Sequence, residues 1–113
     1  MANPIQATQA QDSTTIARLT GSLTVMNAPD LRMGLLDAIK ANKPKVLALN
    51  LAEVDFVDSS ALGVFVEARR QMTASEGSVT FTNVNDDIRG LMRIMNLESV
   101  FDFVDDEGEL SES

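Results

Sequence analysis

A short run of hydroxyl side chains beside a carboxylate is the part of the sequence best suited to chemistry. Asp58, Ser59 and Ser60 stand together and are followed by Ala61. Where a strand passes through a short loop into a helix, unpaired backbone N–H groups and the positive end of the helix dipole gather. That place suits a phosphate group, or a protein surface that must distinguish serine from phosphoserine. Asp and Ser are equally common as plain helix caps, so the run alone leaves both interpretations open.

Residue types that are missing exclude other kinds of site. The chain has no Cys and no His. This removes the two commonest zinc ligands and the Cys–His and Ser–His pairs on which many hydrolases depend. No disulfide can form, which fits a reducing compartment. These absences argue against most hydrolases, and we expect a protein that is not an enzyme, with no catalytic residue, metal or cofactor.

Two carboxylates, Asp55 and Asp58, form a second candidate site at the same strand end. The pair resembles the phosphoacceptor strand of receiver domains, which also need acids after the first strand and a Lys after a later one. Residues 21–23 supply no acid, and no Lys follows Lys45. Metal binding is the other alternative for the pair, but two exposed carboxylates are usually just solvated.

Length and charge limit the class of protein. The chain has 113 residues, 44% of them hydrophobic, which suffices for one domain with an aliphatic core. Its formal net charge of −8 argues against binding to nucleic acid or to an anionic membrane surface. No apolar stretch approaches the roughly 18 residues of a membrane span, and residues 1–6 lack the pattern of a signal peptide. We expect a cytoplasmic monomer that does not insert into membranes.

The elements that must hold the serine run alternate between strand and helix. Residues 46–51 are continuously apolar, which is typical of a strand covered on both faces of a parallel sheet. Helices are predicted to begin at Asn27, after Asp58 and at Asn85. Further strands are predicted at residues 14–20, 78–82 and 100–104. This alternation predicts an α/β domain, a mixed and largely parallel sheet of four to five strands with helices packed on it.

The pattern also divides the chain into three parts. Residues 1–13 form an N-terminal segment that is compatible with an edge strand. Residues 14–104 form the domain. Residues 105–113 are acidic and poor in apolar side chains, so we expect a mobile tail.

The predicted helix after the serine run carries an unusual second stripe. Its main apolar face, centred on Phe65, should meet the core, whereas Leu62 and Val66 lie on the flank. Neighbouring loops could cover this flank, or it could be an exposed docking patch beside Ser59. Under the docking hypothesis, Leu62→Asp weakens partner binding and leaves the fold intact.

Residues 54–64 resemble the signature of STAS domains, most closely that of the bacterial anti-sigma factor antagonists. In that family an apolar strand precedes Asp-Ser-Ser/Thr-Gly-Leu-Gly. Residues 19–23 resemble the family's early Leu-Thr-Gly-Glu-Leu, and residues 88–97 resemble its late segment. The resemblance covers residues 14–103 and implies a single STAS-like domain.

The resemblance implies a regulatory partner-binding module. In the family, the unmodified antagonist binds an anti-sigma factor, which then releases its sigma factor. The anti-sigma factor is often also a serine kinase that phosphorylates the first Ser of the motif, and a serine phosphatase reverses this. The matching residue is Ser59, with Ser60 as the second candidate. The implied partner surface comprises Asp58, Ser59 and Ser60, together with Leu62 and Val66 from the docking hypothesis.

Departures from the family pattern keep an alternative function open. Ala61 stands where the family usually has Gly, and its methyl group could crowd a kinase that approaches Ser59. Ser22 and Thr24 stand where the family often has Glu and Asp. Some STAS domains are partner subunits of transporters or parts of signalling scaffolds and need no phosphorylation, and this chain could be one of them.

Overall fold

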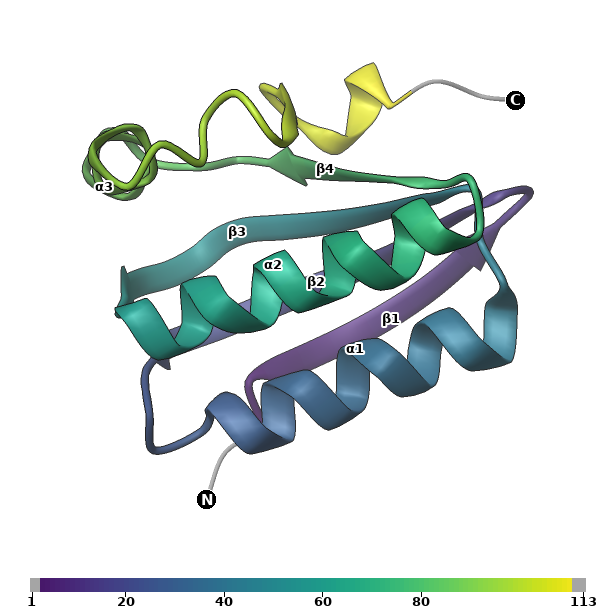
Figure 1. Ribbon diagram of the computed structural model, residues 1–113, viewed down its shortest axis with the longest axis horizontal. Helices are drawn as coiled ribbons and strands as arrows, with labels where there is room; N and C mark the ends of the chain where they lie inside the picture. The colour runs from purple at the N-terminus through teal and green to yellow at the C-terminus, as the bar shows by residue number, and fades with distance from the viewer. Residues whose placement is uncertain (1–2, 111–113) are drawn as a thin grey trace.

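A computed structural model describes residues 3–110 of the chain. Strands and helices alternate after an initial pair of strands (Figure 1). The elements in chain order are β1 (Ile5–Gln11), β2 (Thr14–Leu23), α1 (Ala28–Asn42), β3 (Val46–Val57), α2 (Ser59–Ala74), β4 (Ser78–Thr82), α3 (Asp86–Ile94), β5 (Asp102–Val104) and the 3₁₀ turn η1 (Glu107–Glu109). No helix among residues 3–110 is long and apolar enough to cross a bilayer.

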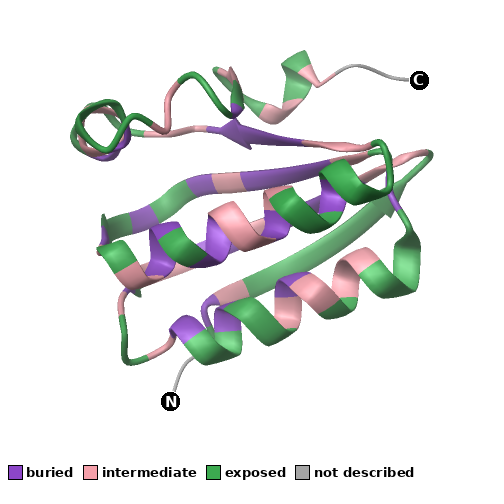
Figure 2. Cartoon of the chain, in the orientation of Figure 1, coloured by how far each residue is buried: buried purple, intermediate pink, exposed green. Residues whose placement is uncertain are grey.

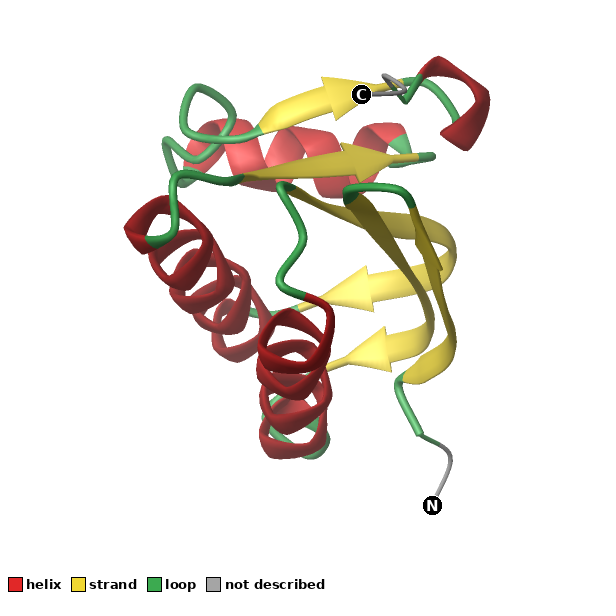
Figure 3. Cartoon of the chain, turned by 90° about the vertical axis from the view of Figure 1, so that its right-hand side faces the viewer, coloured by secondary structure: helices red, strands yellow, loops and turns green. Residues whose placement is uncertain are grey.

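The sheet follows the chain, with spatial order β1-β2-β3-β4-β5. β1 pairs antiparallel with β2, and all later pairs are parallel. Because parallel neighbours need crossover connections, a helix separates each of them from the next. Helices α1 and α2 lie side by side on one face of the sheet (Figures 1 and 3). The predicted mixed, largely parallel α/β fold is therefore confirmed.

The core lies between the sheet and its helices. Figure 2 shows buried positions along β3 and β4 and on the inner sides of α1 and α2. Phe81 of β4 is fully buried and makes edge-to-face contacts with Phe65 and Phe101, with ring centroids 5.1 and 4.9 Å apart. Burial of such a ring stabilises the fold by about 1.5–3 kcal/mol. The buried residues Ile88 and Met92 of α3 belong to the same core.

The connection from β2 to α1 differs from the sequence prediction. β2 continues through Gly21, which has a φ of +83°, and ends at Leu23 instead of Thr20. Asn27 does precede α1, but its side chain makes no cap bond to the helix. Its Oδ1 instead accepts a hydrogen bond from the Thr24 N–H at 2.9 Å, and its Nδ2 donates to the Ser22 carbonyl at 2.9 Å. Asn27 therefore shapes the loop before the helix.

The C-terminal segment folds back on the sheet. The guanidinium of Arg18 in β2 donates to both carboxylate oxygens of Glu107, at 2.9 and 2.7 Å, and Asn50 of β3 donates to the same carboxylate. The bond from Arg18 holds the pKa of Glu107 below its ordinary range. Within the predicted tail, Glu107 therefore contacts β2 and β3, through partners that lie far away in sequence. Residues 111–113 of the predicted tail are outside the described residues.

Candidate functional site

The candidate site lies where β3 passes into α2. β3 ends at Val57, and Asp58 is the N-cap of α2 with extended backbone angles (φ −104°, ψ −178°). The Oδ1 atom of Asp58 accepts a hydrogen bond from the Ala61 N–H at 3.1 Å. This bond satisfies one of the free N–H groups of the first helical turn. The N–H of Asp58 donates to the Leu23 carbonyl at 3.0 Å, which fixes the junction to the end of β2.

Asp58 also holds the neighbouring loop. Its second carboxylate oxygen accepts a hydrogen bond from the N–H of Val25, in the β2–α1 loop, at 2.9 Å. A parallel link joins the Ser22 hydroxyl to the Asp55 carboxylate at 2.8 Å. The sequence motif and the β2–α1 loop therefore form one structural unit, which the sequence analysis did not anticipate.

Ser59 and Ser60 follow the cap as the first two residues of α2. Ser59 is exposed, and Ser60 is half-buried. Neither hydroxyl takes part in a hydrogen bond within residues 3–110, since the local cap bonds are made by Asp58. The first turn of α2 contains no acidic residue. The Ser59 hydroxyl is thus accessible from solvent at the positive end of a helix.

Three exposed apolar side chains accompany the serines, and we call them the apolar rim. Val25 and Met26 of the β2–α1 loop are 64% and 72% exposed, and Phe56 near the end of β3 is 54% exposed. The Asp58–Val25 bond places the loop beside Ser59. Large apolar side chains gathered in water often mark a protein contact surface. The sequence patterns did not identify these residues as a surface, because exposure depends on contacts between segments that are distant in sequence.

Leu62 does not belong to this surface. It is 3% exposed and lies in the hydrophobic core, and Val66 is half-buried and packs against the same core. Arg69, on the same flank of α2, donates to the Val100 carbonyl at 2.6 Å, so this flank faces the connection between α3 and β5. The prediction that Leu62 forms part of an exposed docking stripe is therefore wrong, because its side chain is buried in the core.

Ala61 also has no part in the outer surface. Its exposed fraction is 0%, so its methyl group lies in the core and not in the path of an approaching protein. The substitution of the family's usual Gly by Ala therefore adds core packing at this position. The steric objection to modification of Ser59 does not follow from the geometry.

The receiver-like alternative does not fit the geometry. Receiver-type sheets place the first strand in the interior, in the order 2-1-3-4-5, whereas here the spatial order follows the chain. Lys45 directly precedes β3 and Asp55 lies near the other end of the strand, ten residues further on, so the two side chains cannot meet at one site. Within residues 3–110, no group of three or more His, Cys, Asp or Glu side chains is placed to hold a metal ion.

Comparisons with known proteins agree with this architecture. A family model described as STAS domain matches residues 6–110. The anti-sigma-B factor antagonist of Listeria monocytogenes is 26% identical over 93 residues, which cover 82% of this chain and 81% of that protein.

Solved structures share the fold at lower identity. The Bacillus anti-sigma factor antagonist SpoIIAA, in its unphosphorylated form, has a TM-score of 0.71 at 22% identity, covering 91% of this chain and 92% of its own. Its phosphorylated form has a TM-score of 0.68 at 22% identity, covering 90% and 95%. An anti-sigma factor antagonist from Mycobacterium paratuberculosis has a TM-score of 0.79 at 17% identity, covering 91% and 86%.

Proposed function

Because this chain belongs to the STAS domain family, we propose that it is an anti-sigma factor antagonist that phosphorylation of Ser59 switches off. One observation carries the proposal. The Ser59 hydroxyl is exposed at the start of α2 and makes no hydrogen bond within residues 3–110, and Asp58 ties the loop that carries Val25 and Met26 to the same helix start. The relatives named as antagonists support the choice of an anti-sigma factor as the partner.

The unmodified surface suits protein binding. Val25, Met26 and Phe56 offer apolar area that a partner can cover, and the neutral Ser59 and half-buried Ser60 add little desolvation cost. Asp58 fixes the loop relative to the helix, because its two carboxylate oxygens accept hydrogen bonds from backbone N–H groups of the loop and of the helix. Docking therefore requires little rearrangement.

Phosphorylation would change this surface and spare the fold. In the proposed reaction the Ser59 oxygen attacks the terminal phosphorus of ATP, ADP leaves, and the hydroxyl proton passes to a base of the kinase. The product carries about 1.5 to 2 negative charges and three acceptor oxygens. In the free protein the N–H groups and dipole of α2 stabilise this charge. In a closed interface beside Asp58 and the apolar rim, burying it is costly, so the partner dissociates.

The switch can be tested directly. The protein is incubated with ATP and the anti-sigma factor kinase of its own organism, and the modified residue is located by mass spectrometry. We expect modification of Ser59, loss of the modification in Ser59→Ala, and its persistence in Ser60→Ala. A serine phosphatase of the same cytoplasmic system should restore binding.

Two results would contradict the proposal. The first is that the protein binds the anti-sigma factor but neither serine becomes phosphorylated, which would contradict the phosphorylation switch. Modification without any loss of binding would do the same. Absence of anti-sigma factor binding altogether would favour the role of a transporter or scaffold subunit.

A further inference from the structure

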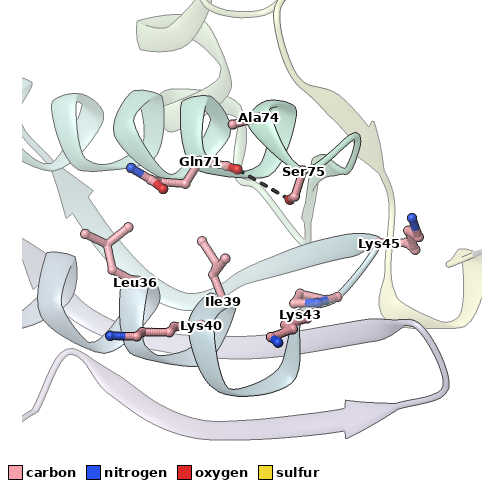
Figure 4. Close-up of a pocket in the computed structure, with 9 residues that line it drawn as sticks. Leu36, Ile39, Lys40, Lys43, Lys45, Gln71, Ala74 and Ser75 are labelled. Atoms are coloured by element: carbon pink, nitrogen blue, oxygen red, sulfur yellow. Dashed lines mark hydrogen bonds between the residues drawn. The ribbon is translucent and has the colours of Figure 1, made fainter.

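A groove lies between the C-terminal halves of α1 and α2, at the opposite end of α2 from the serines. Its volume is about 660 Å³, within the range of about 300 to 1,000 Å³ that small-molecule sites occupy. Leu36 and Ile39 point from α1 toward α2, whose Gln71 and Ala74 form the other wall (Figure 4). Pro44 is a further apolar residue that lines it. The groove is therefore mainly aliphatic.

Every lysine of the chain lines this groove, namely Lys40, Lys43 and Lys45. The protein as a whole carries a formal charge of −8, so this concentration of positive charge is an exception. No carboxylate in residues 3–110 lies within 4.0 Å of a lysine nitrogen, whereas Arg18, Arg32, Arg89 and Arg93 all form ion pairs. The lysine charges are therefore available to a ligand.

The backbone that carries two of these lysines is held in place. The N–H of Lys43 donates to the Ile39 carbonyl at 2.9 Å. The N–H of Lys45 donates to the Ser13 carbonyl at 2.7 Å, and its carbonyl accepts from the Ser78 N–H at 2.9 Å. Lys43 adopts a left-handed conformation (φ 46°), in which glycine would be less strained. The backbone at the basic edge of the groove is thus fixed, and the chain has a lysine where glycine would be less strained.

The chemistry of the groove selects among anionic ligands. Its lining residues include no aromatic side chain on which a nucleotide base could stack. The C-terminal ends of both α1 and α2 lie at this groove, and their dipoles present negative charge there. Three lysines carry more positive charge than these two helix ends carry negative charge, so an anionic head group is attracted, and the aliphatic wall suits a hydrocarbon chain. We propose that the groove binds an amphiphile with an aliphatic chain and one carboxylate head, such as a fatty acid.

This site is separate from the serine motif. Ser59 and Gln71 are twelve residues apart on α2, which corresponds to about 18 Å along the helix. A ligand in the groove would touch neither Ser59 nor the apolar rim. The inference therefore does not depend on the antagonist function, and it can succeed or fail by itself.

Decanoate, used below its micelle-forming concentration, is the probe. Binding to the full chain is measured by isothermal titration calorimetry and located by NMR chemical-shift changes. We expect saturable binding with shifts at Ile39 and Ala74, and about tenfold weaker binding of decyltrimethylammonium, whose head has the opposite charge.

Substitutions then test the named residues. Lys43→Gly removes a charge and relaxes the backbone, so its loss of affinity cannot be attributed to unfolding. The triple variant that combines Lys43→Gly with Lys40→Gln and Lys45→Gln should bind decanoate about tenfold more weakly. Ala74→Glu, at an exposed position, should weaken it at least as much. Arg70→Gln is the matched control, because it removes an exposed cation of α2 that does not line the groove.

The proposal is overturned by absence of decanoate binding, or by equal binding of the cationic amphiphile. It is also overturned if the lysine variants bind as well as the original protein. Shifts confined to Val25, Met26 and Phe56 would place the ligand on the apolar rim instead and would equally exclude the groove.

Discussion

Helices α2 and α3 begin in the same way but carry different charges. Each follows a strand of the parallel sheet and has an N-cap side chain that accepts a backbone hydrogen bond three residues later. Asp58 accepts from the Ala61 N–H at 3.1 Å, and Asn85 accepts from the Ile88 N–H at 2.8 Å. After the cap, α2 continues with two serines and no acid, whereas α3 continues with Asp86 and Asp87.

The difference shows that a helix cap alone does not make a regulatory site. The first turn of α3 has permanent negative charge near its positive end, so its electrostatic state is fixed. The first turn of α2 is neutral, so a phosphate can add there the charge that α3 always carries. Only at α2 does the cap residue also bind a neighbouring loop with exposed apolar side chains, through the Val25 N–H. Neutral hydroxyls and the apolar rim together distinguish the candidate switch.

The largest change in the free energy of unfolding is expected when a charge is placed in the core next to the start of α2. Leu62→Asp puts a carboxylate at a position that is 3% exposed, and should destabilise the fold by on the order of 4 kcal/mol. Ile94→Asp at the end of α3 is the matched control, because Ile94 is 78% exposed and should tolerate the change. Urea unfolding followed by circular dichroism measures both. A stable Leu62→Asp protein would restore the docking-patch hypothesis.

Making the start of α2 resemble that of α3 should abolish the proposed activity. Ser59→Asp should weaken anti-sigma factor binding by about 100-fold, or about 2.7 kcal/mol, with little change in thermal stability. Ser59→Ala should bind like the original, and Asp86→Ser should have no effect on binding. Titration calorimetry with the purified partner gives all three values. Undiminished binding by Ser59→Asp would contradict the switch.

The two cap residues should differ in their contribution to stability. Asp58→Ala leaves both the Ala61 and the Val25 N–H without a partner and should cost about 2 kcal/mol of unfolding free energy. Asn85→Ala removes one such bond and should cost about 1 kcal/mol. Chemical unfolding of both variants is the measurement. Equal losses would mean that the bond to the β2–α1 loop contributes nothing.

The apolar rim should contribute affinity without contributing stability. Phe56→Ser should weaken partner binding about tenfold, or about 1.4 kcal/mol, because the ring is 54% exposed in the free protein and would be covered in the complex. Val100→Ser, an exposed change near α3, is the control and should leave affinity unchanged. A weaker complex with both variants would show that the contact surface is not confined to the start of α2.

The smallest change in stability is expected at the ion pair between Arg18 and Glu107, which belongs to neither helix start. Glu107→Gln breaks the pair with Arg18 and should cost at most about 1 kcal/mol at pH 7. Because the folded pKa of Glu107 is depressed, its contribution is present above the unfolded value, about 4.3, and is lost as pH falls through the folded pKa. The original and variant should therefore become equally stable in acid. Unfolding curves from pH 7 to pH 3 test this, and a constant difference would contradict it.

The sequence predicted the strands and helices because the patterns that mark them involve only residues close together in the chain. The continuous apolar run of residues 46–51 identified β3, and Asn85 with the following acids identified the start of α3. The place of the serines at a strand-to-helix junction followed from the same patterns. Contacts between distant segments could not be predicted in this way. The pair of Arg18 and Glu107 spans 89 residues, and nothing in either neighbourhood signals it.

The surface of the site was harder to predict than its central motif. A helical wheel places Leu62 on the flank of α2, but it contains no information about the segments, distant in sequence, that bury this flank. The sequence patterns also gave no indication that Phe56 is exposed. Its exposure arises where the pairing of β2 with β3 shifts register, between Gly21 and Ser22, which changes the side chains that face the core.

The agreement between spatial order and chain order in the sheet has a consequence for synthesis. Each new strand pairs with the one made just before it, so the domain can assemble by successive addition while the ribosome is still translating. The ion pair between Arg18 and Glu107 cannot form until residue 107 has been made and has left the ribosome. A released chain that stops before residue 107 should therefore form the sheet without the ion pair that ties residue 107 to it.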